Sequence, residues 1–305
     1  MINVGEATAV SFGRTRLIAF VSTLENVLRT IIPFALIWFG FDISVICISF
    51  VLVRFTALIP YLWAARRKLS RFAFNAADFS QILRVSPTFG GTIILASVNW
   101  QAGIILLGFF STEAESAKYG VASRFLIPVT ILMASYANVL QPVIARYVEN
   151  AIEKAGSSMS KMLGYPLLLS TAAAIASPFL SRPVLTIFFG DHYGEAAGTL
   201  NVLAMSVVPF CVVMIVSRGL IATNSQHIDF FANALGVVTC ITVGVLLIPH
   251  HGAIGAAAAQ LFAFLLMAVL EAGYLSRKLI NFRFRQKAYI SFSCLLIIQL
   301  IIWKF

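Results

Sequence analysis

Five charged side chains, those of Glu25, Arg29, Arg54, Arg124 and Glu271, fall within long apolar stretches of the sequence, where each needs a partner or a watery cavity. Arg29, Arg54 and Arg124 are positive, and Glu25 stands four residues before Arg29 on the same face of a predicted helix. A charge at the bilayer centre costs about 2.5 to 3.5 kcal/mol on insertion scales, so such residues are commonly functional. A guanidinium binds phosphate oxygens through two parallel hydrogen bonds and stays protonated. The arginines therefore predict binding of an anionic group, with Glu25 as a supporting ion pair.

Each of these residues also has a structural interpretation. Glu25 and Arg29 alone would form a self-neutralising pair that lets the helix insert. Arg54 has no acidic residue near it in the sequence and would pair with an absent N-terminal helix, whereas the long side chain of Arg124 would reach the outer interface. Glu271 is expected at the inner membrane surface, and the alternative is a proton or cation coupling site.

Neutral polar side chains add candidates for binding a sugar. Gln101 and Asn138 are embedded in apolar segments and offer hydrogen bonds to sugar hydroxyls, although such residues more often join helices at about 1 kcal/mol or less each. The sequence shows no nucleophile-base pair, which argues against an enzyme. It predicts no cofactor, and the cysteines lack the paired spacing of disulfides or metal sites: Cys47, Cys211, Cys240 and Cys294.

The elements that must position these side chains are membrane-spanning helices. Hydrophobic residues make up 60% of the 305 residues and charged residues 11%, which excludes an ordinary soluble domain. A spanning helix needs roughly 20 mostly apolar residues, and continuous apolar runs favour helices over a membrane barrel. The sequence predicts an all-α polytopic membrane protein with about nine transmembrane helices, at 17–40, 43–64, 86–110, 119–145, 162–181, 196–218, 229–249, 252–275 and 288–303.

The distribution of basic residues predicts the orientation. The chain carries a net charge of +10, but most of its 22 lysines and arginines fall in alternate loops, which argues against nucleic-acid binding. Basic loops face the cytoplasm. The pattern therefore predicts a multi-pass protein of the bacterial inner membrane, surrounded by membrane lipids, whose N-terminus is cytoplasmic.

Two hairpins suggest how the chain is organised. The first turns at Gly40-Phe41-Asp42 and the second at Pro249-His250-His251-Gly252, and each ends in a basic pair followed by leucine. Such a match indicates a parallel internal repeat, and a chance match between apolar hairpins is the alternative. The repeat would make this an N-terminally truncated chain with four regions: the last two helices of a lobe (1–64), a basic interfacial connector (65–85), a complete six-helix lobe (86–280) and an additional C-terminal helix (281–305).

Several motifs resemble those of polysaccharide and O-antigen flippases, over about 30–280. The motifs are Leu107-Gly108-Phe109-Phe110, Lys118-Tyr119-Gly120-Val121-Ala122-Ser123-Arg124-Phe125, Leu140-Gln141-Pro142, Phe189-Gly190-Asp191-His192-Tyr193 and Gly252-Ala253-Ile254-Gly255-Ala256-Ala257. Many members carry an acidic residue shortly before the Leu-Gly pair, where this chain has Asn99-Trp100-Gln101-Ala102-Gly103. An ion-coupling role at that position is therefore not expected.

The resemblance implies membership of the multidrug, oligosaccharidyl-lipid and polysaccharide exporter superfamily. Its members have two six-helix lobes around a cavity and work by alternating access. The polysaccharide branch translocates a polyprenyl-pyrophosphate-linked oligosaccharide, such as an O-antigen, capsule or exopolysaccharide repeat unit of lipopolysaccharide and related polymers. The resemblance also implies polysaccharide polymerase and chain-length machinery as partners.

Two other functions stay open. A drug/cation antiporter of the same superfamily would favour acidic rather than basic cavity residues. A polysaccharide polymerase or ligase would have a long outer loop with clustered polar residues, whereas the longest outer loop here surrounds Asp191, His192 and Glu195.

Overall fold

The computed structural model describes residues 15–56, 60 and 76–279. The chain divides into two compact units, residues 1–81 and 82–305, and each is described by itself. Every regular element among the described residues is a helix, which confirms the predicted all-α class. The predicted helix 288–303 lies outside the described residues, as does most of the predicted connector.

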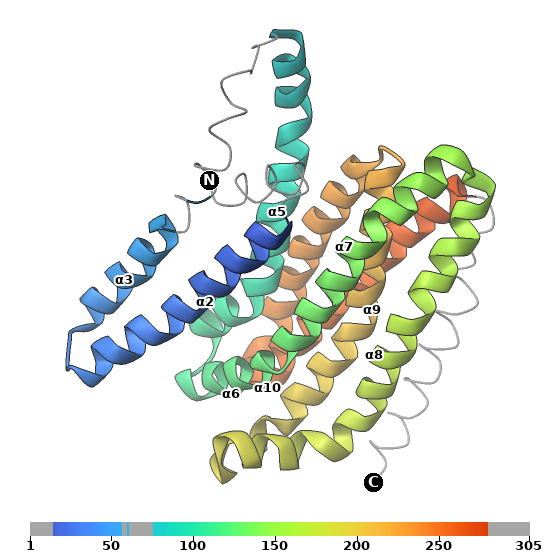
Figure 1. Ribbon diagram of the computed structural model, residues 1–305. Helices are drawn as coiled ribbons and strands as arrows, with labels where there is room; N and C mark the ends of the chain where they lie inside the picture. The colour runs from blue at the N-terminus through green and yellow to red at the C-terminus, as the bar shows by residue number, and fades with distance from the viewer. Residues whose placement is uncertain (1–14, 57–59, 61–75, 280–305) are drawn as a thin grey trace. The chain divides into compact units, whose positions relative to one another are not determined.

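The first unit contains a helical hairpin. Helix α2 (Thr15–Trp38) and helix α3 (Ile43–Thr56) lie side by side in Figure 1 and contact each other. The turn between them is the expected one, because the backbone N–H of Phe41 donates to the carbonyl of Leu36 at 3.0 Å and the carbonyl of Asp42 accepts from the start of α3. The structure therefore confirms the predicted turn.

The second unit contains a bundle of long helices. Its helices are α5 (Ala76–Phe110, which begins in the first unit), α6 (Glu113–Arg124), α7 (Leu126–Asn150), α8 (Ile152–Phe189), the 3-10 helix η1 (Asp191–Ala196), α9 (Ala197–Ala222) and α10 (Gln226–Lys278). In the described part of the chain, five helical stretches are long and apolar enough to cross a membrane. The expected total of nine is therefore not confirmed.

Helix α10 is itself a hairpin. Its helical geometry breaks at Gly252, whose φ of 51° and ψ of −128° suit a residue without a side chain. The chain then reverses, since the Nζ atom of Lys278 at the end of α10 lies 2.6 Å from the carbonyl oxygen of Thr223, just before its start. The predicted spans 229–249 and 252–275 are the two halves of this hairpin.

The predicted span 119–145 was wrong in its start and its continuity. Helix α6 begins earlier, because the Thr112 side chain accepts a hydrogen bond from the backbone N–H of Glu115 at 3.4 Å and so caps the helix. It ends before Phe125, and α7 follows at once. Pro128 stands in the first turn of α7, where its missing N–H costs nothing.

Helix α9 forms the centre of the second unit. It contacts α7, α8 and α10, and Figure 1 shows it among them. Its side chains are buried on all sides, including Val208, Val212 and Val216, as expected of a helix that is apolar all round. On the outside of the bundle, Phe179 and Ile187 of α8 are 72% and 78% exposed. Such an apolar exterior suits lipid rather than water.

Candidate functional site

Two arginines share one glutamate in the first unit, and we call Glu25, Arg29 and Arg54 the Glu25 cluster. The side chain of Glu25 is only 6% exposed, and its Oε1 atom accepts a hydrogen bond from Nη1 of Arg54 across the hairpin. Nη1 of Arg29 lies 3.9 Å from the same oxygen. The arginine side chains are 44% and 47% exposed. The cluster therefore carries one uncompensated positive charge and presents two guanidinium groups outward.

This arrangement corrects the structural interpretation of Arg54. Its counterion is Glu25 on α2, so the pairing does not require an absent N-terminal helix. The predicted Glu25–Arg29 pair is present but is the longer of the two contacts. The guanidinium of Arg29 also lies 5.8 Å from the centre of the Phe50 ring on α3, which favours a cation over the aromatic face.

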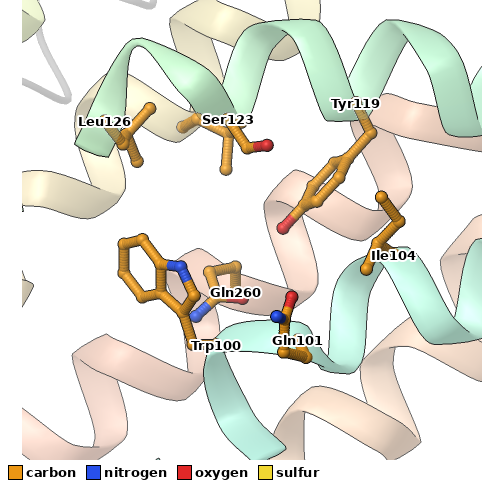
Figure 2. Close-up of a pocket in the computed structure, with 8 residues that line it drawn as sticks. Trp100, Gln101, Ile104, Tyr119, Ser123, Leu126 and Gln260 are labelled. Carbon is orange, nitrogen blue, oxygen red and sulfur yellow. The ribbon is translucent and has the colours of Figure 1, made fainter. Parts of the chain in front are cut away.

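A small cavity lies inside the second unit, and we call it the Gln260 pocket. Its volume is about 60 Å³. Helices α5, α6, α7, α9 and α10 all contribute to its wall, and Figure 2 shows most of the side chains. The lining residues are Trp100, Gln101, Ile104, Tyr119, Ser123, Leu126, Leu203 and Gln260. Of the predicted sugar-binding residues, the structure places Gln101 here.

The polar groups of the pocket converge. In Figure 2 the hydroxyl of Tyr119 and the amide of Gln101 point toward each other from opposite sides. Tyr119 reaches this position because Gly103 has no side chain: a Cβ atom there would lie 2.5 Å from the tyrosine oxygen. Gln260 is 3% exposed, and neither of its amide atoms has a hydrogen-bond partner among the described residues.

A charged clamp holds α6 against the turn of α10, and it consists of Glu115, Lys118, Glu195 and the backbone N–H of Ala253. The Oε2 atom of Glu115 accepts from the Ala253 N–H at 2.8 Å, at the start of the second half of α10. The Nζ atom of Lys118 lies 3.1 Å from Glu115 and 2.9 Å from Glu195 in η1. Because α6 carries Tyr119 and Ser123, the clamp also positions one wall of the Gln260 pocket.

Glu271 is fully buried on the second half of α10. Neither carboxylate oxygen has a hydrogen-bond partner among the described residues. Asp229 lies within electrostatic range and is itself satisfied, because Ser217 and Asn233 donate to its carboxylate at 3.1 and 2.9 Å. An ionised carboxylate is costly to bury without a partner. Glu271 therefore needs a proton or a cation.

Arg124 and Asn138, the other predicted binding residues of the second unit, do not line the pocket. Arg124 is the last residue of α6 and is exposed, and its charge there suits the negative end of the helix dipole. Asn138 is exposed on α7. Two further embedded polar groups join helices, since Tyr136 donates to the carbonyl of Met162 at 2.8 Å and the Asn99 amide lies 3.2 Å from the sulfur of Met267. The structure does not bring Arg124 or Asn138 together with Gln101.

Sequence reasoning missed the Glu25–Arg54 contact and the pocket itself. Glu25 and Arg54 are 29 residues apart, so their contact depends on how two helices align. Part of the clamp is visible in the sequence. Thr112 is followed three residues later by Glu115, which is the capping-box pattern of a helix start. Here, however, the glutamate side chain caps a different helix.

Comparison with known proteins supports a common family. The sequence profile of the family described as "Polysaccharide biosynthesis protein" matches residues 8–198. The chain is 25% identical over 231 residues to the Probable low-salt glycan biosynthesis flippase Agl15 of Haloferax volcanii, covering 75% of this chain and 47% of that protein. It is also 25% identical over 261 residues to the Uncharacterized membrane protein MJ1068 of Methanocaldococcus jannaschii, covering 80% and 49%. The chain thus spans about half the length of the curated relatives it matches.

A solved structure shares the fold. The Lipid II flippase MurJ in an inward closed conformation matches with a TM-score of 0.66 and 17% sequence identity. The match covers 94% of this chain and 61% of that one. At this identity the match shows a common helical fold.

Proposed function

Because the chain belongs to the polysaccharide biosynthesis protein family, as its motifs predicted, we propose that it translocates a lipid-linked oligosaccharide across a membrane by alternating access. The cargo we propose is a polyprenyl-pyrophosphate-linked repeat unit of an O-antigen, capsule or exopolysaccharide. The named flippase among its relatives supports this class of cargo. The chain spans about half of that relative. We therefore propose that it contributes to this transport, and the proposal does not require that it transports alone.

The observation that carries the proposal is the Glu25 cluster. Its two guanidinium groups are about half exposed and share a single buried carboxylate, so hydrogen-bond donors and net positive charge remain for a ligand. A pyrophosphate offers several anionic oxygens, which match the planar fork of arginine. We propose that Arg29 and Arg54 bind the pyrophosphate, that Glu25 positions them, and that Arg124, Gln101 and Asn138 contact other parts of the cargo.

The test is translocation of a fluorescent polyprenyl-pyrophosphate-linked saccharide in vesicles containing the full chain. A charge-assisted hydrogen bond is worth about 1.5 to 3 kcal/mol, so Arg54→Ala should slow transport by roughly tenfold or more. Arg54→Lys keeps the ion pair with Glu25 but loses the fork, and we expect an intermediate rate. Arg146→Ala, an exposed arginine of α7, is the matched control. Equal rates for Arg54→Ala, Arg54→Lys and the control would refute the proposed site.

We further propose Glu271 as the site that couples transport to an ion. Its burial without a hydrogen-bond partner in the described part of the chain favours uptake of a proton or cation there. Glu271→Gln keeps the size of the side chain but cannot ionise. It should make transport insensitive to an imposed ion gradient, whereas the exposed Glu153→Gln should not. An unchanged gradient dependence in Glu271→Gln would exclude this role.

The buried Glu271 is also consistent with the alternative function, a drug/cation antiporter. An antiporter would bind cationic cargo, so efflux of a cationic dye from the same vesicles separates the two functions. The flippase proposal expects no dye efflux. The flippase relative argues against the polymerase or ligase alternative, since its name describes a transporter and not an enzyme.

The location and partners are part of the proposal. We propose the bacterial inner membrane with the N-terminal end of the chain in the cytoplasm, supported by the alternate basic loops. Polysaccharide polymerase and chain-length machinery would then receive the translocated unit on the outer side.

A further inference from the structure

We propose that the Gln260 pocket binds the acetamido group of an N-acetylated sugar in the cargo, an inference that rests on the proposed function. The pocket is a separate site in the second unit, made by different residues from the Glu25 cluster. It would recognise the saccharide part of the cargo, whereas the arginines recognise the anionic part.

The strongest reason is the amide of Gln260. Both its nitrogen and its oxygen are buried and lack a hydrogen-bond partner among the described residues, although the side chain lines an open space. A buried polar group left without a partner is destabilising, so this side chain fits a ligand that both donates and accepts. A second amide meets that requirement, because its N–H and C=O pair with the C=O and NH₂ of a glutamine.

Two further polar groups face the same space. The Gln101 amide comes from α5 and the Tyr119 hydroxyl from α6, and both point into the pocket in Figure 2. The Tyr119 hydroxyl packs against the backbone of Gly103 and borders the same pocket. None of the lining residues is charged. The lining therefore selects a neutral ligand with several hydrogen-bonding atoms, and a phosphate or a cation would find no counterion there.

The remaining walls match the apolar end of an acetamido group. Ile104, Leu126 and Leu203 line the pocket, and the last two are 5% and 1% exposed. Apolar walls do not stabilise a bound water. An acetyl methyl group would be removed from water against them, which is favourable. The indole of Trp100, which packs against Phe210 and Phe264, also lines the pocket.

The size of the cavity agrees with this ligand. A buried water needs at least about 10 to 15 Å³, so about 60 Å³ holds a group of a few heavy atoms but no complete disaccharide. The exposed side chain of Gln101 lies at the pocket wall, so the rest of the sugar would extend outward past it. We therefore expect the pocket to recognise one substituent of the sugar and not the whole ring.

The experiment uses Trp100 as the reporter. The full chain has four tryptophans, and replacing Trp38, Trp63 and Trp303 by phenylalanine leaves Trp100 alone. The purified protein in lipid nanodiscs is titrated with N-acetylglucosamine, glucosamine and glucose while the fluorescence of Trp100 is recorded. We expect a saturable change with N-acetylglucosamine and at least about tenfold weaker binding of the other two, since one hydrogen bond is worth about a factor of ten.

Two variants test the residues. Gln260→Leu should weaken binding of N-acetylglucosamine by about tenfold or more, because it removes the amide and keeps the packing volume. Gln226→Leu, at the half-buried start of α10 and outside the pocket, should bind like the parent. Equal responses to all three sugars, no saturable response, or an unchanged titration in Gln260→Leu would each overturn the proposal and leave the pocket as a water site.

The two proposals can fail separately. Binding of geranylgeranyl pyrophosphate to the same nanodiscs depends on the Glu25 cluster and does not require the Gln260 pocket. Loss of sugar discrimination with intact pyrophosphate binding and transport would overturn only the pocket proposal. Sugar discrimination without pyrophosphate binding or transport would overturn the proposed function instead.

Discussion

Replacing Glu115 by alanine should destabilise the second unit by breaking the clamp. The substitution removes the acceptor for the Ala253 N–H at 2.8 Å, a cap for the second half of α10, which is worth about 0.5 to 2 kcal/mol. It also removes the partly exposed ion pair with Lys118 at 3.1 Å, worth about 0.2 to 1 kcal/mol. The expected loss is about 2 kcal/mol, which corresponds to a Tm about 4 to 8 °C lower for a unit of this size.

Thermal unfolding of the purified chain in detergent, followed by tryptophan fluorescence, measures this loss. Glu113→Ala is the matched control, because Glu113 also stands in the first turn of α6 but is exposed and takes no part in the clamp. Both glutamates interact with the positive end of the helix dipole, so the difference between the two variants isolates the clamp. A Tm lowered equally by both substitutions would refute the role of Glu115 as a cap for α10.

Three further substitutions test packing in the second unit. Gly252→Ala should cost about 1 to 3 kcal/mol because a side chain is strained at φ 51°, and circular dichroism melting should show a lower Tm than for Gly273→Ala, where an added Cβ meets nothing. Gly103→Ala should lower the free energy of unfolding by about 1 to 3 kcal/mol, because the added Cβ would displace the Tyr119 ring. In a double-mutant cycle, Tyr119→Phe in the same chain should recover part of that loss. Purely additive losses would contradict the contact between Gly103 and Tyr119. Tyr136→Phe should lower stability by about 0.6 kcal/mol, because it removes a 2.8 Å hydrogen bond to α8, and an unchanged denaturation midpoint would show that this bond contributes nothing.

The sequence predicted the helices better than their boundaries. Long apolar runs separated by basic loops identify membrane spans, and the turns at Gly40 and Gly252 are visible because glycine interrupts these runs. The start of α6 at Glu113 was missed because its first turns are polar and do not resemble a membrane span. The break at Phe125 was missed because apolar residues continue on both sides of it.

The candidate site was less predictable because its contacts are tertiary. Arg54 and Glu25 meet through the alignment of α2 with α3, which no spacing along one helix encodes. The Gln260 pocket is lined by residues from five helices. In the sequence, an amide within an apolar run is equally consistent with a pocket residue and with a hydrogen bond between two helices. Burial of Glu271 depends on which face of α10 packs inward, and the apolar residues surround α10 without a preferred face.

The α10 hairpin is fastened at both of its ends by charged groups. At the closed end, Glu115 holds the backbone of Ala253, and at the open end Lys278 donates to the Thr223 carbonyl and to the Ser225 hydroxyl at 2.6 and 2.5 Å. Sliding the hairpin along α6 would break the attachment at Ala253, and sliding it along α9 would break the attachment of Lys278 to Thr223. We therefore expect α6, α9 and α10 to move together as one rigid unit during the proposed transport, so that the hinge of any rocking motion lies outside the hairpin.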